Sequence, residues 1–321
     1  MLTPRPQFEK IVVVTRKTAL EELILRFNTR DQARFYIESL GQDFAEYEAA
    51  HKVYQGQLAH LRAEMPEKMR VQFLERGEVP TYSFGQHDLV VTLGPDGLVV
   101  NVAKYLSGQP LLAFNPDPAR IDGVLVPFGT LYSHYLGQAL AGQLRAYSVT
   151  MAEAKLADGQ RLLAVNDFFI GASSHVSARY RLKHQKQEEN QSSSGIIVST
   201  GAGSTGWYRS VTTGALRVAA GVVGAEAPEV AEKLYRFAPN ERKLVFAVRE
   251  PFESRVSGAK LVHGVVEAGE QLVVSSQMPQ NGVIFSDGIE SDYLAFNSGA
   301  VAHIGIAPET LSLLVPAGFG K

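Results

Sequence analysis

The chain has 321 residues, with 31 Lys and Arg against 33 Asp and Glu and a formal net charge of −2. This length indicates about two domains, and the balanced charge provides no general positive field to hold a nucleic acid. The absence of cysteine excludes disulfides, thiolate metal sites and cysteine nucleophiles. A hydrophobic fraction of 45% is typical of a folded globular protein.

Targeting signals and membrane spans are not indicated. The first residues, MLTPRPQFEK, lack the apolar core of a signal peptide and are too acidic for a transit peptide. The longest uncharged stretches, 123–144 and 191–208, contain too many polar residues or glycines for a membrane span. We therefore expect a cytoplasmic protein that does not bind a membrane.

The first half of the chain predicts alternating strands and helices. Short apolar runs at 11–15, 88–93 and 111–114 are typical of buried parallel strands. Apolar residues at helical spacing over 33–65 predict a long helix or two helices bent near Gly41. Further helices are expected to end at Leu106 and to span 130–144. The order predicts a parallel α/β sheet with a ligand crevice at the carboxyl ends of its strands.

The second half predicts antiparallel strands. Apolar residues alternate with polar ones at 147–151 and 176–182, and Asp158-Gly159 is a hairpin signal. Further strands are expected at 195–200, 243–248, 261–267, 271–275, 283–285, 293–296 and 301–306, and the polar segment 183–194 is expected to be an exposed hairpin loop. We expect an α/β nucleotide-binding domain over 1–145 and a β-rich domain over 146–321, with the tail, about 307–321, as a candidate to return to the first.

Two glycine-rich segments are candidate binding loops. Gly201–Gly206 has the G-x-G-x-x-G spacing of a dinucleotide fold, with Glu226 about twenty residues later. Its position between predicted antiparallel strands disfavours a dehydrogenase, although its backbone N–H groups suit a ligand. In Gly94–Leu98 the Asp96 carboxylate follows a buried strand, where it suits a phosphate, a metal or a hydroxyl; the ordinary alternative is a turn with Asp as helix N-cap.

The order of motifs resembles the NAD kinase family, and most closely its mitochondrial-type branch. That family carries a Gly-Gly-Asp-Gly-Thr loop, an Asn-Thr-Asp-Pro turn, an Asn-Glu pair and a loop of the form STPTGSTAY. This sequence has, in the same order, GPDGL at 94–98, NPDPARIDGVL at 115–125, VNDFFIG at 165–171, SSSGIIVSTGAGSTGW at 192–207, Arg249-Glu-Pro251 and FSDG at 285–288. The resemblance covers about Asp88 to the C-terminus.

The resemblance implies an NAD-kinase-like fold and transfer of the ATP γ-phosphoryl group to the 2′-hydroxyl of the adenosine ribose of NAD. Asp96 would be the general base or metal partner, between the phosphate-loop glycines Gly94 and Gly97. It also implies a homodimer, with Mg²⁺ arriving with ATP and no metal site of protein ligands. The remaining residues implied to bind dinucleotide or shape the crevice are Asn115, Asp117, Asn166, Asp167 (where the family has Glu), Ser204, Thr205, Gly206 and Trp207.

Two substitutions in the phosphate loop keep other functions open. Pro95 stands where the family has its second glycine and has no backbone N–H to offer a phosphate. Leu98 replaces a threonine hydroxyl by an apolar side chain. The alternatives are a catalytically impaired protein that binds NAD(H) or NADP, and a lipid or sugar kinase of the same superfamily. Three arginines considered for phosphate are expected to be surface charges: Arg120, Arg179 and Arg209.

Overall fold

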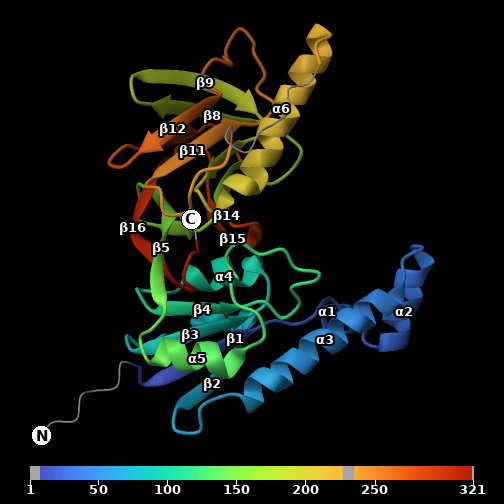
Figure 1. Ribbon diagram of the computed structural model, residues 1–321. Helices are drawn as coiled ribbons and strands as arrows, with labels where there is room; N and C mark the ends of the chain where they lie inside the picture. The colour runs from blue at the N-terminus through green and yellow to red at the C-terminus, as the bar shows by residue number, and fades with distance from the viewer. Residues whose placement is uncertain (1–7, 227–234, 320–321) are drawn as a thin grey trace, which may run out of the picture. The chain divides into compact units, whose positions relative to one another are not determined.

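The computed structural model describes residues 8–226 and 235–319. The chain divides into two compact units (Figure 1), unit 1 being Met1–Tyr147 with Ser312–Lys321 and unit 2 being Ser148–Leu311. The boundary expected from the sequence was 145/146. In the described part of the chain, no helix combines the length and the apolar character needed to cross a membrane.

Unit 1 contains a parallel sheet in the order β2-β1-β3-β4, and the end of β16 adds to it parallel to β4. Every residue of β3 is buried, as its mainly apolar sequence predicts. The edge strand β2 was not expected, because its side chains are mostly half-buried or exposed. The strands are β1 Lys10–Thr15, β2 Arg70–Glu75, β3 Asp88–Leu93 and β4 Pro110–Phe114.

Three helices follow β1 and form an arm that extends from the sheet of unit 1 (Figure 1). They are α1 Ala19–Phe27, α2 Arg30–Ser39 and α3 Phe44–Ala63. The break expected near Gly41 is confirmed, since this glycine has a φ of 74° between α2 and α3. The other helices of unit 1 are the 3-10 helix Arg76–Thr81, α4 Asp96–Ala103 and α5 Tyr132–Leu140.

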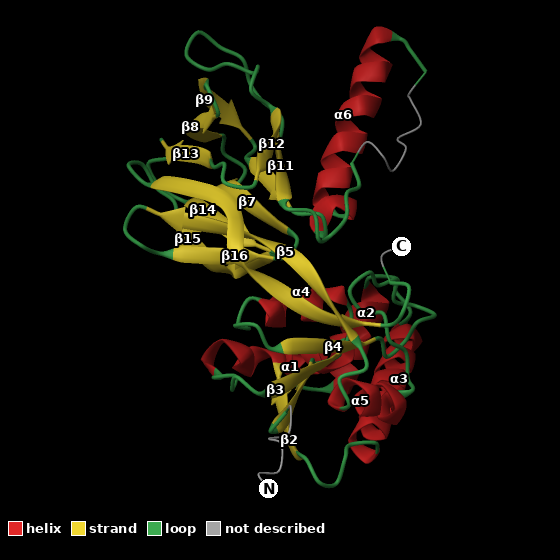
Figure 2. Ribbon diagram, turned by 60° about the vertical axis from the view of Figure 1, so that its left-hand side comes forward, coloured by secondary structure: helices red, strands yellow, loops and turns green. Residues whose placement is uncertain are grey.

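Unit 2 is built mainly of antiparallel strands (Figure 2), as the sequence predicts. One sheet has six strands in the order β12-β11-β10-β7-β14-β15. The first part of β16 pairs with β13, which pairs with β8 and then β9, while β5 and β6 form the expected hairpin. The elements are β5 Arg145–Leu156, β6 Arg161–Ala164, β7 Asp167–Ala172, β8 Ala178–His184, β9 Gln187–Ser193, β10 Ile196–Ser199, α6 Trp207–Val223, β11 Lys243–Val248, β12 His263–Glu267, β13 Leu272–Ser276, β14 Gly282–Ser286, β15 Ile289–Ala295 and β16 Val301–Val315.

Two features of unit 2 differ from the sequence analysis. The segment 183–194 forms a hairpin, as expected, but it consists of paired strands and not of a loop, because β8 and β9 pair along it and turn at Gln185 and Lys186. The strand β9 was missed because its residues are polar. One of them, Gln191, is nevertheless buried and donates from Nε2 to the Leu261 carbonyl at 2.9 Å. In addition, α6 follows the glycine loop 201–206 directly, and this helix was not predicted. The glycine loop is still not the dinucleotide-binding turn of a dehydrogenase. That turn needs two parallel strands joined by the helix, whereas β10 and β11 pair antiparallel.

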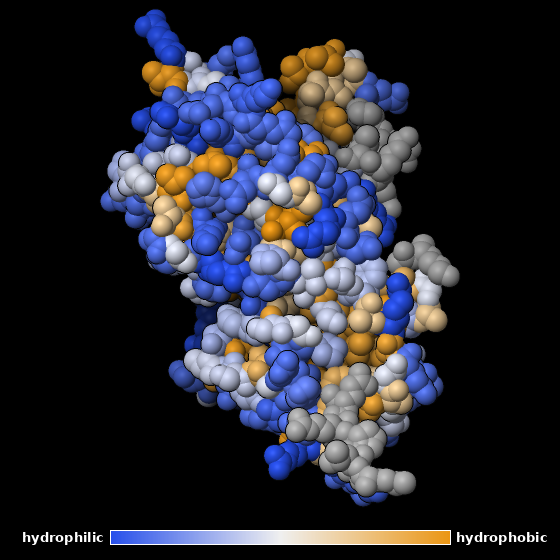
Figure 3. All heavy atoms as spheres, turned by 90° about the vertical axis from the view of Figure 1, so that its left-hand side faces the viewer, coloured by the Kyte–Doolittle hydropathy of each residue, from blue (hydrophilic) through white to orange (hydrophobic). Residues whose placement is uncertain are grey.

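The two faces of β7 explain how unit 2 separates core from site. Phe168 and Ile170 point into the core between the sheets. The alternate positions, Asp167 and Phe169, face the other side, where Phe169 packs with Trp207 of α6. Farther along, α6 is exposed: Val222 has 82% of its surface accessible. Figure 3 shows one face of the molecule, on which apolar patches lie within a mainly hydrophilic surface.

Candidate functional site

The loop that joins β3 to α4 packs tightly around Gly94. The Gly94 N–H donates to the Phe114 carbonyl at 3.1 Å. A Cβ at this position would lie 2.9 Å from Leu98 Cδ2 and 3.5 Å from Arg16 Cδ. Pro95 is the N-cap of α4 and makes no side-chain capping bond. Gly97 is exposed, with open space where a Cβ would lie. The loop thus has a hydrophobic anchor and few free donors.

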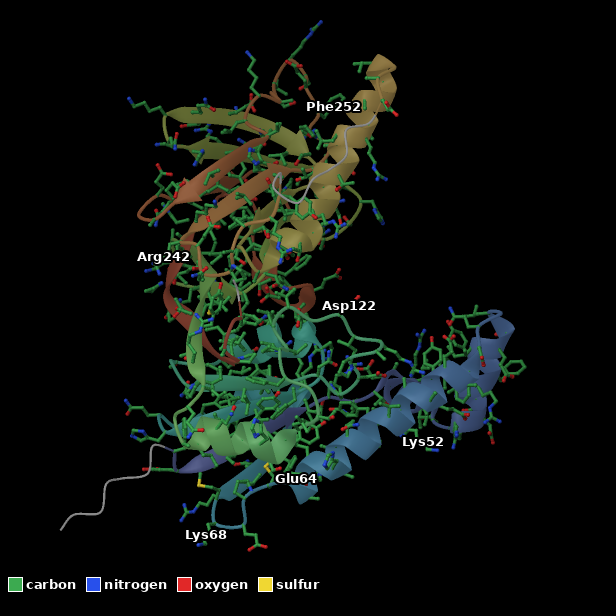
Figure 4. The ribbon with its side chains drawn as sticks, viewed as in Figure 1. Lys52, Glu64, Lys68, Asp122, Arg242 and Phe252 are labelled. Carbon is green, nitrogen blue, oxygen red and sulfur yellow. The ribbon has the colours of Figure 1, made fainter. Side chains whose placement is uncertain are left out.

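Asp96, the predicted base, binds a neighbouring loop of its own unit. One carboxylate oxygen accepts the Val124 N–H at 2.8 Å and the other accepts the Leu125 N–H at 2.9 Å. Burial raises the pKa of Asp96, and hydrogen bonds from the backbone of residues 124–126 partly oppose this rise. The carboxylate therefore holds the long loop between β4 and α5, in which Asp122 is labelled in Figure 4.

Asn115 and Asp117 begin that same loop. The Asn115 side chain donates to the Ile121 carbonyl at 2.9 Å and accepts the Asp117 N–H at 3.0 Å, so its amide is used within the turn. The Asp117 carboxylate lies 3.8 Å from the Arg120 guanidinium. Asn115 consequently shapes the loop, whereas Asp117 lines a cavity.

This cavity, named here the arm cavity, has a volume of about 760 Å³ and lies within unit 1. Its walls come from the loops after β1, β3 and β4 and from helices α1 and α3 of the arm. Carboxyl ends of parallel strands are where open α/β sheets bind ligands. Its walls include Arg16, Thr18, Asp43, Glu46, Tyr47, His51, Tyr54, Pro95, Asp117 and Arg120.

In unit 2, Asp287 holds the Asn166-Asp167 pair. Its Oδ1 accepts the N–H of Asn166 at 2.7 Å and that of Asp167 at 3.4 Å, and its Oδ2 accepts the Val165 N–H at 3.2 Å. The Asp287 N–H in turn donates to the Asp167 carbonyl at 2.9 Å. The FSDG segment therefore fixes the backbone of the Asn-Asp motif, although the sequence reasoning gave Asp287 no role.

The Asp167 carboxyl is the most perturbed acid of this cluster. Its residue is 7% exposed, and among the described residues no hydrogen bond reaches its carboxyl oxygens. Burial, together with the nearby charge of Asp287, raises the pKa of Asp167 from 3.8 to about 7. Such a carboxyl suits a ligand hydroxyl, because it can accept or donate a hydrogen bond near neutral pH.

The glycine loop packs on the same backbone. The Thr200 N–H donates to the Asn166 carbonyl at 2.9 Å, and a Cβ at Gly203 would lie 2.2 Å from that oxygen. Ser204 is buried and donates to the Gly201 carbonyl at 2.7 Å, so its hydroxyl serves the loop. Thr205 is half-buried and Gly206 exposed at the start of α6, with no side-chain cap on that helix.

Trp207 lies in a second cavity of about 1080 Å³ within unit 2, the aromatic cavity. Its ring stacks on Phe169 with centroids 5.7 Å apart, and Phe169 stacks on Phe285 at 4.9 Å. The Arg249 guanidinium lies 5.5 Å from the centre of the indole. Hydroxyl and amide groups line the rest, from Ser173, Ser174, Ser194, Asn281 and Asn297.

The predicted residues therefore form two groups. Asn166 and Asp167 contact the glycine loop in unit 2, while Asp96 and Asn115 serve one loop of unit 1. Arg16 and His51 were missed, because a residue that follows the first strand, or lies on a helix, carries no local motif. In the described residues, no three His, Asp or Glu side chains lie close enough together to hold a metal ion.

Comparison with known proteins finds relatives of low identity that cover most of the chain. No family model matches the chain. NAD kinase 2, mitochondrial, of Rattus norvegicus is 22% identical over 370 residues, covering 94% of this chain and 85% of that protein. The probable NADH kinase of Oryza sativa subsp. japonica is 25% identical over 257 residues, covering 70% of this chain and 72% of its own.

Two solved structures share the fold. The NAD kinase from Archaeoglobus fulgidus in complex with ATP matches with a TM-score of 0.55 and 15% identity, covering 95% of this chain and 93% of that one. Yeast NADH kinase complexed with NADH matches with a TM-score of 0.58 and 14% identity, covering 99% and 89%. The chain therefore shares the fold of these NAD and NADH kinases, and its low-identity relatives and the order of its motifs point to the NAD kinase family.

Proposed function

We propose that this protein is an NAD kinase, which transfers the terminal phosphoryl group of ATP to the 2′-hydroxyl of the adenosine ribose of NAD. One observation carries the proposal: three motifs far apart in the sequence meet around a buried carboxyl. Loop 200–206 and Asp287 both bind the backbone of Asn166-Asp167, and the Asp167 carboxyl makes no hydrogen bond among the described residues. The relatives that are kinases of NAD or NADH support the same substrate.

In this proposal unit 2 holds the acceptor. Asp167 hydrogen-bonds a ribose hydroxyl, and the aromatic cavity takes a base or the nicotinamide ring, with Phe169 and Trp207 as its aromatic wall. Arg249 supplies positive charge beside that wall for the pyrophosphate. Trp207 already stacks on Phe169, so the ligand contacts its edge or displaces Arg249.

Asp96 is the proposed base. The reaction breaks the O2′–H bond and the bond between the γ-phosphorus and the ADP oxygen, and forms the O2′–phosphorus bond. Asp96 takes the proton, and ADP leaves. For this, its carboxylate must exchange the N–H groups of Val124 and Leu125 for the ribose hydroxyl. Mg²⁺ would arrive with the donor, held by its phosphates and by water.

The test is formation of NADP from NAD and Mg-ATP by the full-length protein, measured with an NADP-specific dehydrogenase. Asp96→Asn should lower the rate about 100-fold or more, while leaving quenching of Trp207 fluorescence by NAD unchanged. Asp122→Asn is the matched control, since Asp122 is exposed in the same loop that Asp96 holds. The proposal is wrong if the protein forms no NADP from NAD with either ATP or inorganic polyphosphate as the donor.

A second candidate is a protein of the same fold that binds dinucleotide without phosphoryl transfer. Two observations favour it. The Asp96 carboxylate already accepts two backbone N–H groups, and Pro95 gives the loop after β3 one N–H fewer than a glycine would. It predicts NAD binding at Trp207 with no turnover. The double change Pro95→Gly and Leu98→Thr should then raise kinase activity, and an unchanged rate would argue against a loop-based defect.

A further inference from the structure

The arm cavity lies where the topology of unit 1 favours a ligand. From β1 the chain runs through the arm to β2 on one side, whereas β3 and β4 lie on the other side of β1. Connections that leave in opposite directions create a crevice at the carboxyl ends of the two central strands. Arg16 follows β1 and Pro95 follows β3, and both line this cavity. Its volume of about 760 Å³ suits a ligand of nucleotide size.

The loop after β3 offers a phosphate fewer donors than the family's loop does. Pro95 lacks an N–H, and Leu98 is a buried apolar side chain. Both oxygens of Asp96 accept backbone N–H groups. Phosphates in this cavity consequently need donors from elsewhere.

Arg16 is placed to supply them. Its side chain crosses Gly94, with Cδ 3.5 Å from where a Cβ would lie. Its own N–H donates to the Tyr54 hydroxyl at 3.0 Å, and that hydroxyl donates to the Leu93 carbonyl at 3.2 Å, so the ends of β1 and β3 are tied together. Nε of the guanidinium donates to the Lys17 carbonyl at 3.1 Å. Its two NH₂ groups have no hydrogen-bond partner among the described residues.

A second guanidinium comes from the loop after β4. Arg120 is 53% exposed, and its distance of 3.8 Å from Asp117 is too long for a hydrogen bond. The acids Asp43 and Glu46 also line the cavity but are exposed, and Asp43 accepts the Ala45 N–H as the N-cap of α3. Water therefore screens them more than it screens the half-buried Arg16.

The wall opposite the strand ends belongs to the arm. The Thr18 hydroxyl donates to Glu21 Oε2 at 3.1 Å and lies 2.8 Å from His51 Nδ1. Since the carboxylate can only accept, the Thr18 oxygen takes its bond from His51 Nδ1–H. Tyr47 adds an aromatic ring to the same wall. A nucleoside therefore meets imidazole and phenol groups on this side.

The geometry points to a donor site in unit 1: Arg16 and Arg120 bind the polyphosphate chain of the phosphoryl donor in the arm cavity, in place of the donors that loop 94–98 lacks. The inference rests on the proposed function, which requires such a donor. A guanidinium suits it because its paired N–H groups match two phosphate oxygens. The shared chemistry is a chain of phosphates, whether from a nucleoside triphosphate or from inorganic polyphosphate.

Calorimetric titration of the full-length protein tests this with Mg-ATP and, separately, with inorganic tripolyphosphate. Arg16→Gln should weaken binding of both about tenfold, and Arg120→Gln should weaken it less because Arg120 is more exposed. Arg70→Gln, an exposed arginine of β2 outside the cavity, is the control and should not change either affinity. Binding of ATP but not tripolyphosphate would identify a nucleotide donor, and the reverse a polyphosphate donor; either supports the site.

The site and the kinase activity fail in different ways. Unchanged affinity in the Arg16→Gln, Arg120→Gln double variant, or no binding of either probe to the wild type, overturns the site. If the arginine variants lose donor binding while the wild type makes no NADP, the site stands and the proposed activity falls. Thermal unfolding of each variant, compared with wild type, excludes misfolding as the cause.

Discussion

Asp167→Asn should make unit 2 more stable at alkaline pH while impairing the proposed binding site. The buried Asp167 carboxyl has a pKa of about 7, raised by burial and by Asp287 from an ordinary value of 3.8. The difference, about 7 minus 3.8, corresponds to about 4 kcal/mol at ~1.36 kcal/mol per pH unit. An asparagine has nearly the shape of the protonated acid but carries no ionisable group.

The sign of the pH dependence follows from where the proton resides. Below about pH 4 the carboxyl is protonated in both the folded and the unfolded chain, so its ionisation costs no stability. Between pH 4 and 7 the unfolded chain releases the proton and the folded chain keeps it, so wild-type stability falls as pH rises. Above pH 7 the loss is complete. The stability of Asp167→Asn minus that of wild type should therefore increase by up to about 4 kcal/mol from pH 4 to pH 8.

Urea unfolding at pH 4.5, 6 and 8 measures this difference. Trp207 is the only tryptophan of the chain and belongs to unit 2, so its fluorescence reports the unit in which Asp167 is buried. Glu253→Gln, at an exposed acid of the same unit, is the control. A stability difference for Asp167→Asn that stays constant within about 1 kcal/mol across this pH range would refute the reasoning.

Two further variants test the cluster around Asp167. Gly203→Ala should destabilise unit 2 by about 2 kcal/mol or more and weaken NAD binding, because its Cβ would lie 2.2 Å from the Asn166 carbonyl oxygen. Gly214→Ala, inside α6 with open space at the Cβ position, should instead stabilise by about 0.5–1 kcal/mol; urea unfolding compares the two, and equal effects would contradict the packing argument. Asp287→Ala should lower the free energy of unfolding by about 2–4 kcal/mol, because it leaves backbone N–H groups without an acceptor. Hydrogen exchange of the Asn166 N–H measures this effect, and a rate equal to that of wild type would show that Asp287 does not bind this backbone.

The sequence predicts the buried strands well and the polar ones poorly. The expected strands at 88–93 and 243–248 coincide with β3 and β11, because an apolar run bounded by turn residues has few other ways to be buried. By contrast, β9 has a polar composition and is recognisable only through its pairing with β8. The helix α6 was missed because its glycine, threonine and valine content is low in helix propensity.

The candidate site shows the same division between local and long-range information. The Asn166-Asp167 pair and loop 201–206 are visible as motifs, yet their contact depends on the pairing of Asp167 with Ser199 in neighbouring strands. Asp287 lies in a segment that the sequence singles out, but its role appears only when β14 returns beside β7. Arg16 has no motif at all and gains importance from the strand order.

The structure also changes the weight of the evidence that each half of the site provides. Gly94 has a structural reason to be glycine, since a Cβ would lie 2.9 Å from Cδ2 of the buried Leu98 side chain. Its presence therefore does not by itself argue for phosphate binding. Asp167 has no such reason, because a buried carboxyl without a hydrogen bond lowers stability at neutral and alkaline pH. A group that lowers stability is expected where function requires it. The evidence for dinucleotide binding by unit 2 is therefore stronger than the evidence for donor binding by loop 94–98. Donor binding is better sought at Arg16.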